Sequence, residues 1–569
     1  MGMRVLVRWR WGNGYAGGMS GAVEAEYERR LAAANAAYAR AQGRGSGFRF
    51  AALAAGAALV LVLKEAAGIA HVDALAIAVV VSGLAMLALM MRAGEQAFRA
   101  SRVASFYRAS LARVRGESLS TGLLGERFAA DGHLYAHDLN VVGKDSLFDR
   151  LATTRTAVGQ RGLARLLLEP ASAAVARARQ EAVRELTPNM DLQERVALLG
   201  RFKFEDVPAE KYEKWLDLER SDLPRWMHGV LLLTTVAWVA VIVAGLVLKM
   251  DSTLVWQNVG LVFLVQGLVC LRLRKKVLAE LEAAKKLLGQ TAILREGLKV
   301  MRAQGFAAGR LKELQVAAEG EDLALKRLER HLAVVEQRPK EWFFAFSLAF
   351  ALGTHAAIAL DAWKREFDEP MRRWLAAWGE FEALVALATY AAEHEECCWP
   401  EILDEGAAVA VFEAEGLWHP LLAAKDAVAN DVALGEGVRF LLVSGSNMAG
   451  KSTLLRAMGA AVVMALAGAP VAAKKVRMSA LRVGASLAIV DALGEGKSKF
   501  LAEVERLKAM VDLARGSRGL ELFLIDEIFS GTNSVDRRAA AESVLRSLVE
   551  AGAVGAISTH DLALASIAD

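Results

Sequence analysis

The chain has 569 residues, and 69 lysines and arginines against 65 aspartates and glutamates give a formal net charge of +4. This length is too great for one compact core and indicates about two to four domains. Hydrophobic residues make up 54% of the chain, which excludes a disordered protein and is high for a soluble one. The nearly neutral balance does not itself indicate nucleic-acid binding. Three cysteines cannot form a disulfide framework, so we expect a reducing compartment.

The excess of hydrophobic residues falls into two pairs of segments. The first pair covers residues 50–63 and 74–91, and the second covers residues 226–248 and 254–271. A membrane-spanning helix needs about 20 apolar residues, a length that the second pair meets and that residues 50–63 do not reach without their flanks. We interpret both pairs as transmembrane helical hairpins, and buried core helices are the alternative.

Basic residues flank both pairs at their outer ends, whereas the short connections inside each pair are nearly neutral. The flanking residues are Arg44, Arg49, Arg92, Arg99 and Arg102 for the first pair, and Arg225, Arg272, Arg274, Lys275 and Lys276 for the second. By the positive-inside rule the connections face outward and the rest of the chain is cytoplasmic. We therefore expect a multi-pass protein of the inner or plasma membrane. Residues 1–20 lack the apolar centre of a cleavable signal peptide, and Met19 is an alternative start.

Three other regions have their own patterns. Residues 342–360 are apolar but carry His355 and charged ends, and we interpret them as a buried helix. Residues 275–337 are dense in Glu, Lys, Arg and Leu, a pattern typical of a long helical lever. From about residue 409, short apolar runs alternate with helical segments, which predicts a parallel α/β domain.

The sequence thus predicts an all-α region with transmembrane hairpins, followed by a C-terminal α/β domain. The predicted parts are a polar helical segment at 1–47, a transmembrane hairpin at 48–92, a helical linker at 93–134, a helical core and lever domain at 135–408 with a second hairpin at 226–272, and the α/β domain at 409–569.

A phosphate-binding motif opens the α/β domain. Residues 439–444 predict a buried strand, residues 445–453 follow the pattern Gly-x-x-x-x-Gly-Lys-Ser, and residues 454–466 predict a helix. Backbone N–H groups of such a loop surround phosphates, and the helix N-terminus adds positive potential. We expect Lys451 to contact the β- and γ-phosphates of ATP and Ser452 to ligate Mg²⁺. The predicted nucleotide-binding residues are Gly445, Ser446, Asn447, Met448, Ala449, Gly450, Lys451, Ser452 and Thr453.

Two further strand ends complete a predicted ATPase site. Residues 521–525 predict a buried strand that ends in Asp526 and Glu527, the pattern of a Walker B motif. We expect Asp526 to hold Mg²⁺ together with Ser452, and Glu527 to polarise the attacking water. Residues 553–558 predict another strand, after which His560 is placed to sense the γ-phosphate. The predicted activity is ATP hydrolysis with ATP and Mg²⁺ as cofactors.

These motifs also carry a family resemblance. The loop at 445–453 resembles the Asn-Met-x-Gly-Lys-Ser-Thr loop of the MutS family of DNA mismatch repair ATPases. Residues 526–536 and 558–561 resemble its Walker B and Thr-His elements, and Ser498, Phe500 and Glu503 resemble its Ser-x-Phe-x-x-Glu signature. Residues 147–159 and 179–186 are similar to the start of the family's core and lever domain. The resemblance covers roughly residues 135–569 and is strongest after about 415.

The resemblance implies an ATP-driven, clamp-like protein that binds DNA as a homodimer, in mismatch repair or another DNA-structure role. It also implies that Ser498 acts on the nucleotide held by the partner subunit. The residues before 135 leave no room for both a mismatch-reading domain and a connector, and the family's Phe-x-Glu has no counterpart there. Phe367-Asp-Glu369 has the letters of that motif but lies in the helical core. Relatives continue beyond Thr559 and His560, so we expect a truncated C-terminus.

The alternative is a membrane-tethered ABC-type ATPase that acts on protein partners or in transport rather than on DNA. The transporter signature Leu-Ser-Gly-Gly-Gln is absent, and Gly496-Lys-Ser-Lys-Phe500 stands in its place. This difference disfavours transport. Stimulation of hydrolysis by duplex DNA separates the DNA-binding hypothesis from a protein-binding one.

Overall fold

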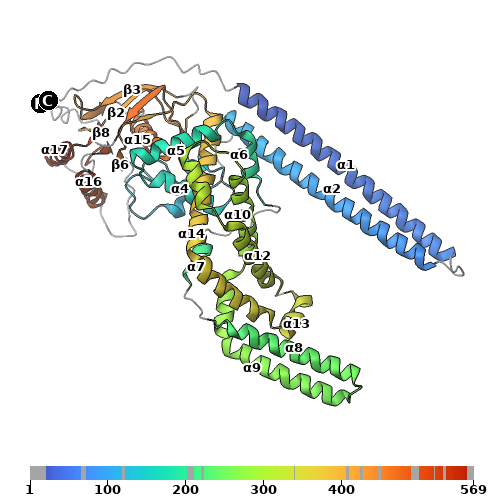
Figure 1. Ribbon diagram of the computed structural model, residues 1–569. Helices are drawn as coiled ribbons and strands as arrows, with labels where there is room; N and C mark the ends of the chain where they lie inside the picture. The colour runs from blue at the N-terminus through green and yellow to red at the C-terminus, as the bar shows by residue number, and fades with distance from the viewer. Residues whose placement is uncertain are drawn as a thin grey trace.

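The computed structural model describes residues 21–65, 72–117, 122–200, 210–218, 223–338, 340–404, 409–422, 427–445, 450–487, 499–517, 520–529 and 534–559. An elongated helical body carries an α/β domain at one end and a helical hairpin at the other, and a second, longer hairpin leaves the body near the α/β domain (Figure 1).

The longer hairpin is formed by the first two helices, α1 (Gly21–Glu65) and α2 (Val72–Val114). Its base is fixed to the body by Arg30, which donates to Asp191 at 2.6 Å, and by Arg113, which pairs with Glu393 at 2.6 Å. The sequence predicted a polar helix followed by a separate apolar one. Instead, α1 is continuous, so the apolar residues 50–63 lie at the far end of one long rod (Figure 1).

The body is built from the long helix α14 (Leu352–Glu393) and from short helices, most of which pack against it. The short helices are η1 (Glu126–Phe128), α3 (Leu147–Leu151), α4 (Ala157–Leu168), α5 (Ala173–Leu186), α6 (Met190–Ala197), α7 (Glu210–Asp217), α10 (Leu287–Arg302), α11 (Gly309–Ala317) and α12 (Glu321–Gln337). Helices α4 and α14 touch at Gly162 and Gly379, where a Cβ on Gly162 would lie 2.0 Å from the Gly379 carbonyl oxygen. Glycine at position 162 therefore permits this close crossing.

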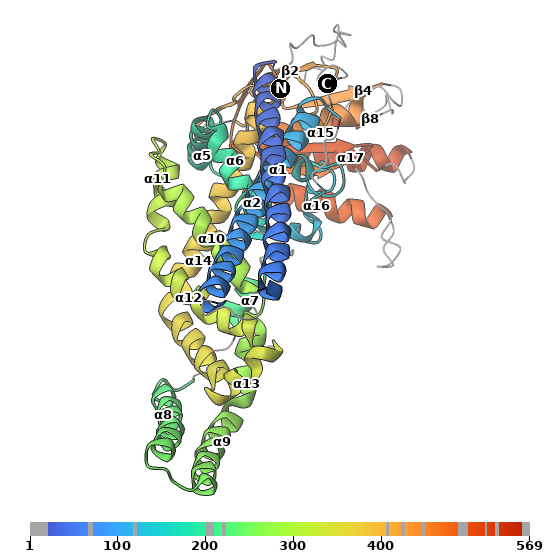
Figure 2. The ribbon, with the colours of Figure 1, turned by 90° about the vertical axis from the view of Figure 1, so that its right-hand side faces the viewer.

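The predicted single lever at 275–337 is wrong. This segment begins with the last residues of α9 (Ser252–Ala284) and then forms α10, α11 and α12, which pack on the body (Figure 2). Three breaks divide the segment: one lies between α10 and α11, at residues 303–308, and the other two fall at Lys286 and Gly320, both in the left-handed region with φ of 67° and 81°. These turns fold the segment on itself, so the amphipathic faces are buried within the body.

The second hairpin consists of α8 (Trp226–Val247) and α9 (Ser252–Ala284), and both helices are long and apolar enough to cross a membrane. Only 11% of the most apolar 18-residue window of each helix is buried. Next to it, α13 (Glu341–Ala349) bends by 73° from α14. The prediction of a buried helix at 342–360 is therefore wrong for its first half, because Phe344, Phe346 and Leu348 are exposed.

The α/β domain contains two sheets of four strands each. One is entirely parallel, in the order β4-β8-β7-β6, and the other is mixed, in the order β1-β5-β2-β3. The strands are β1 (Glu401–Ile402), β2 (Phe412–Leu417), β3 (Asn430–Leu434), β4 (Phe440–Ser444), β5 (Lys475–Met478), β6 (Arg482–Ser486), β7 (Glu521–Asp526) and β8 (Val554–Thr559). The parallel α/β prediction is confirmed for the first sheet, and the mixed sheet was not anticipated.

Helices cover both faces of the parallel sheet, which explains its continuous apolar strands. Leu522 and Leu524 face the core that includes α15 (Lys451–Ala467). Phe523 and Ile525 face the opposite core, with α16 (Lys499–Gly516) and α17 (Ser534–Glu550). This layering leaves the carboxyl ends of β4, β7 and β8 at one edge of the sheet.

Candidate functional site

The predicted phosphate-binding loop joins β4 to α15 at that edge. Gly450 has φ of 77° and is the N-cap of α15, so its missing side chain leaves the first-turn N–H groups without a cap from that residue. The Lys451 side chain is buried, and its Nζ donates to the carbonyl oxygen of Gly445 at 2.6 Å. Ser452 is the second residue of α15, and Thr453 is exposed. An uncapped helix N-terminus beside a lysine suits an anion.

The two predicted metal ligands are in contact. The Ser452 hydroxyl donates to Oδ2 of Asp526 at 2.5 Å, and the Ser558 hydroxyl donates to Oδ1 of the same carboxylate. Hydroxyl and carboxylate oxygens are ligands that Mg²⁺ accepts, and Mg²⁺ commonly combines one carboxylate with substrate phosphates. The donor set therefore fits Mg²⁺. No group of three or more His, Cys, Asp or Glu side chains that could hold a metal occurs in the described part of the chain.

Glu527 lies in an unusual turn immediately after β7. Both Glu527 and Phe529 have φ of 55°, a conformation uncommon for residues with a side chain. The Glu527 amide donates to the Ser558 carbonyl oxygen at 3.0 Å. The Phe529 amide donates to Oε1 of Glu503 at 2.6 Å, and the ring of Phe529 is 5.8 Å from that of Phe500. Glu503 is buried, and its hydrogen bond to the Phe529 amide holds the turn that contains Glu527.

Several predicted site residues lie outside the described residues. These are Ser446, Asn447, Met448, Ala449, Ser498 and His560. The structure brings Gly445, Lys451, Ser452, Asp526 and Glu527 to one edge of the sheet, and their catalytic roles stay predictions.

Sequence reasoning missed how this edge is connected to the helical body. Arg506 of α16 forms an ion pair with Asp138, and its Nε donates to the Ala485 carbonyl oxygen at 2.7 Å. The Leu487 amide donates to Oδ1 of Asp138 at 2.7 Å. Asp138 is buried and belongs to the segment that precedes α3. A single aspartate in an irregular segment gives no sequence pattern from which this connection could have been predicted.

The sequence around this site is similar to that of known proteins. Residues 441–569 match the family model described as MutS domain V. The chain is 39% identical over 150 residues to "Endonuclease MutS2" from Thermus thermophilus, which covers 26% of this chain and 20% of that protein. It is 30% identical over 254 residues to "DNA mismatch repair protein MutS 2" from Halobacterium salinarum, covering 43% and 28%. It is also 30% identical over 253 residues to "DNA mismatch repair protein MutS" from Chlorobaculum parvum, covering 42% and 26%.

The matched segments thus span less than a third of each of these relatives. The matched residues contain β7, β8 and all of β4 except Phe440. The similarity is thus to the MutS family: residues 441–569 match MutS domain V, and the mismatch repair relatives share part of their length with this chain.

Proposed function

We propose that this chain is a membrane-anchored ATPase of the MutS family that binds duplex DNA and couples DNA binding to ATP hydrolysis. The observation that carries the proposal is the contact between Ser452 and Asp526, beside Lys451 and the uncapped N-terminus of α15. This arrangement has the donors for a triphosphate and the oxygen ligands for its metal ion.

Each residue at this edge has a separate role in the proposal. Lys451 binds the β- and γ-phosphates after releasing the Gly445 carbonyl oxygen, and backbone N–H groups of residues 445–453 surround the phosphates. Ser452 and Asp526 hold Mg²⁺, which when bound neutralises developing charge on the phosphates. Ser558 orients the Asp526 carboxylate. Glu527 accepts a hydrogen bond from water and directs it toward the γ-phosphate.

The choice of DNA as partner comes from the relatives, several of which are named as DNA mismatch repair proteins. A role in mismatch repair or in recognition of another DNA structure is proposed on this basis. We further propose a homodimer in which Ser498 and His560 complete the ATP sites, as the family resemblance implies.

The two hairpins support anchoring in a membrane. In Figure 1, α1–α2 and α8–α9 extend from the body toward the same side, and Figure 2 shows them as two separate pairs. The apolar residues 50–63 and 74–91 lie toward the connected ends of the longer hairpin, so both apolar regions can enter one bilayer. The basic residues of α9 that follow residue 271 are exposed and lie toward the body. By the positive-inside rule this favours a protein of the inner or plasma membrane whose α/β domain is cytoplasmic.

The ATPase proposal is tested with two variants that fail in different ways. For the full chain in lipid nanodiscs, Lys451→Ala is expected to lose both ATP affinity and turnover, because the phosphate ligand is removed. Glu527→Gln is expected to keep ATP affinity within a few-fold while turnover falls about 100-fold or more, because only water activation is lost. Glu550→Gln, an exposed change in α17, serves as the control. Wild-type turnover in Glu527→Gln would contradict the assignment.

A further inference from the structure

Helix α13 carries an apolar surface that the rest of the described chain leaves uncovered. Phe344, Phe346 and Leu348 are 56%, 53% and 67% exposed, whereas Ser347, the only polar residue among residues 343–349, is buried. A helix at the surface of a soluble domain has the opposite distribution, with its polar side chains outward. The distribution in α13 is that of a helix with apolar surroundings, because polar side chains in such surroundings face the protein.

Helix α13 lies beside the apolar hairpin α8–α9 (Figures 1 and 2). The ring of Phe350, which follows α13 directly, is 5.3 Å from that of Trp238 on α8. The side-chain amide of Gln266 on α9 donates to the carbonyl oxygen of Ala349 at 3.0 Å. Gln266 is buried, and its own oxygen accepts from the Thr234 hydroxyl of α8 at 3.1 Å. The end of α13 is therefore attached to the two helices that we propose to enter the bilayer.

The contacts of Gln266 satisfy the backbone at the break between α13 and α14. Ala351 has φ of 49°, and the last carbonyl groups of a helix have no partner within that helix. The Leu348 carbonyl oxygen accepts from the Ala351 amide at 3.2 Å, and Gln266 supplies the donor for Ala349. Irregular backbone at membrane depth is tolerated only where the protein itself bonds the polar groups. These two carbonyl groups meet that condition.

The chain enters and leaves this position on the same side. Before α13, the Arg338 side chain lies against Gly353, where an added Cβ would be 2.9 Å from its Nε. After the break, the ring of His355 stacks on that of His228, with 2.7 Å between the two Nδ1 atoms. His228 is near the start of α8, three residues after the basic Arg225. The segment from 340 to 352 thus returns to the level at which it began.

The depth of the break follows from its partners on the hairpin. Gln266 precedes Arg272 by six residues and Thr234 follows Arg225 by nine, which correspond to about 9 and 14 Å along the two helices. The hydrocarbon core of a bilayer is about 30 Å thick, so the break lies in the half nearer the basic ends. Helix α13 has 9 residues and a length of about 13 Å, which is too short to cross the core.

We propose that residues 340–353 form a re-entrant segment in the cytoplasmic leaflet of the membrane, in which lipid acyl chains cover Phe344, Phe346 and Leu348. The proposal rests on the membrane anchoring proposed above and adds a third membrane contact to the two hairpins. Lys340 is exposed where the segment begins, which suits the anionic headgroups of that leaflet. Because the segment leads directly into α14, the helix that packs against α4 and α5 also begins in the bilayer.

The test places one nitroxide label at a time in the full chain in lipid nanodiscs. The label at Leu348→Cys probes α13, and two further positions are controls with similar exposure. Leu264→Cys, on α9 and 60% exposed, reports the lipid, and Val316→Cys, on α11 and 64% exposed, reports water. Collision rates are measured with oxygen, which concentrates in hydrocarbon, and with a neutral nickel chelate, which stays in water. Far-ultraviolet circular dichroism checks that each labelled chain is folded. Alanine replaces the three native cysteines, Cys270, Cys397 and Cys398.

We expect the label at position 348 to match that at 264, with frequent oxygen collisions and at least about tenfold fewer nickel collisions than at 316, because the polar chelate is excluded from hydrocarbon. Frequent nickel collisions at 348, with 264 in lipid, would overturn the re-entrant segment and leave the hairpin anchoring standing. Few collisions with either probe at 348 would show that protein, such as a second copy of the chain, covers α13, and would also overturn it. Frequent nickel collisions at 264 would overturn the anchoring and the segment together.

Discussion

The Glu503 carboxylate accepts a hydrogen bond from the backbone amide of Phe529 at 2.6 Å, which connects the helix of the signature motif to the turn after β7. The same helix carries Arg506, whose ion pair with Asp138 reaches the segment before the helical body. One helix therefore contacts both the turn of the proposed water-activating Glu527 and the region that precedes the core. A shift of α16 would therefore move the turn after β7 and the segment around Asp138 together.

Replacing Glu503 is expected to impair hydrolysis without removing a ligand of ATP. Glu503→Ala leaves the Phe529 amide buried without an acceptor, at a cost of about 1–3 kcal/mol, and releases a turn held at positive φ. We predict a fall in turnover of about tenfold with ATP affinity kept within a few-fold. Glu503→Gln retains a carbonyl acceptor and is expected to be milder. Lys508→Ala, on an exposed position of α16, is the control. An equal loss in Glu503→Gln and Glu503→Ala would argue against the hydrogen bond.

We predict that Glu521, at the start of β7, makes the free energy of unfolding depend on pH. It is fully buried, its carboxyl oxygens have no hydrogen-bond partner among the described residues, and burial raises its pKa from 4.5 to about 8. Between these values the folded state keeps the proton that the unfolded state has lost. The contribution of Glu521 to the free energy of unfolding is therefore fully present below about pH 4.5. It falls as pH rises toward 8, by up to about 1.4 kcal/mol per pH unit.

Glu521→Gln removes this titration while preserving the size of the side chain. The difference in melting temperature between the variant and wild type is expected to shift in favour of the variant from pH 6 to pH 8. Comparing the two proteins at each pH cancels the other titrating groups. A difference that does not change between pH 6 and pH 8 would show that Glu521 does not carry a proton in the folded protein.

The exposed faces of α8 and α9 predict an integral membrane protein. Carbonate washing at high pH is expected to leave the full chain in the membrane pellet, because the apolar helices are not held by surface charge. Leu233→Arg combined with Leu264→Arg, at exposed positions of the two helices, is expected to lower the membrane fraction, since each arginine costs about 3 kcal/mol at a helix centre. Release of wild-type protein by carbonate would support peripheral attachment instead.

The family resemblance predicts that Ser498 acts across a dimer. Mixing Lys451→Ala protein with Ser498→Ala protein gives mixed dimers in which one composite site has both an intact loop and an intact signature. About half of a wild-type dimer's ATP hydrolysis per mixed dimer is expected to return. Activity no greater than the sum of the separate variants would contradict action across a dimer, and crosslinking would then show whether the subunits associate.

The parallel sheet and its site were predictable because their signals are local. Buried parallel strands read as continuous apolar runs, and the predicted strand at 439–444 differs by one residue from β4 (Phe440–Ser444). The glycine-rich loop and the acidic pair follow these strands directly, so the proximity of Ser452 and Asp526 follows from the topology of a parallel sheet.

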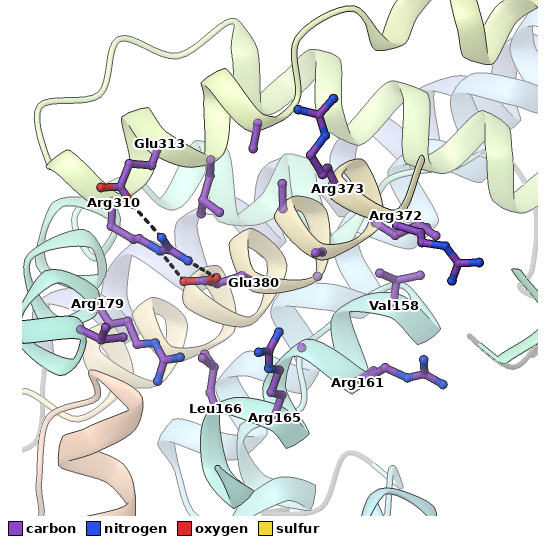
Figure 3. Close-up of a pocket in the computed structure, with 18 residues that line it drawn as sticks. Val158, Arg161, Arg165, Leu166, Arg179, Arg310, Glu313, Arg372, Arg373 and Glu380 are labelled. Carbon is purple, nitrogen blue, oxygen red and sulfur yellow. Dashed lines mark hydrogen bonds and ion pairs between the residues drawn. The ribbon is translucent and has the colours of Figure 1, made fainter. Parts of the chain in front are cut away.

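The rest depended on contacts between distant residues. The bond between Asp526 and Ser558 requires the neighbouring register of β7 and β8, and the pair formed by Asp138 and Arg506 joins segments with no common pattern. The predicted lever failed because the segment breaks at three places, one of them at Lys286, whose left-handed conformation its sequence does not indicate. The cleft between α4, α5, α11 and α14 (Figure 3) gathers residues from four helices, and no pattern in the order of the chain predicts it.

The coupling of ATP hydrolysis to DNA is measured most directly as the hydrolysis rate of the full chain in nanodiscs, with and without saturating matched duplex, at one low salt concentration. The proposal predicts a change in rate of at least threefold on adding duplex, and this change is absent in Glu527→Gln. An identical rate with and without duplex, in protein that hydrolyses ATP, would contradict a DNA-coupled function and favour a membrane-tethered ATPase that acts on a protein partner.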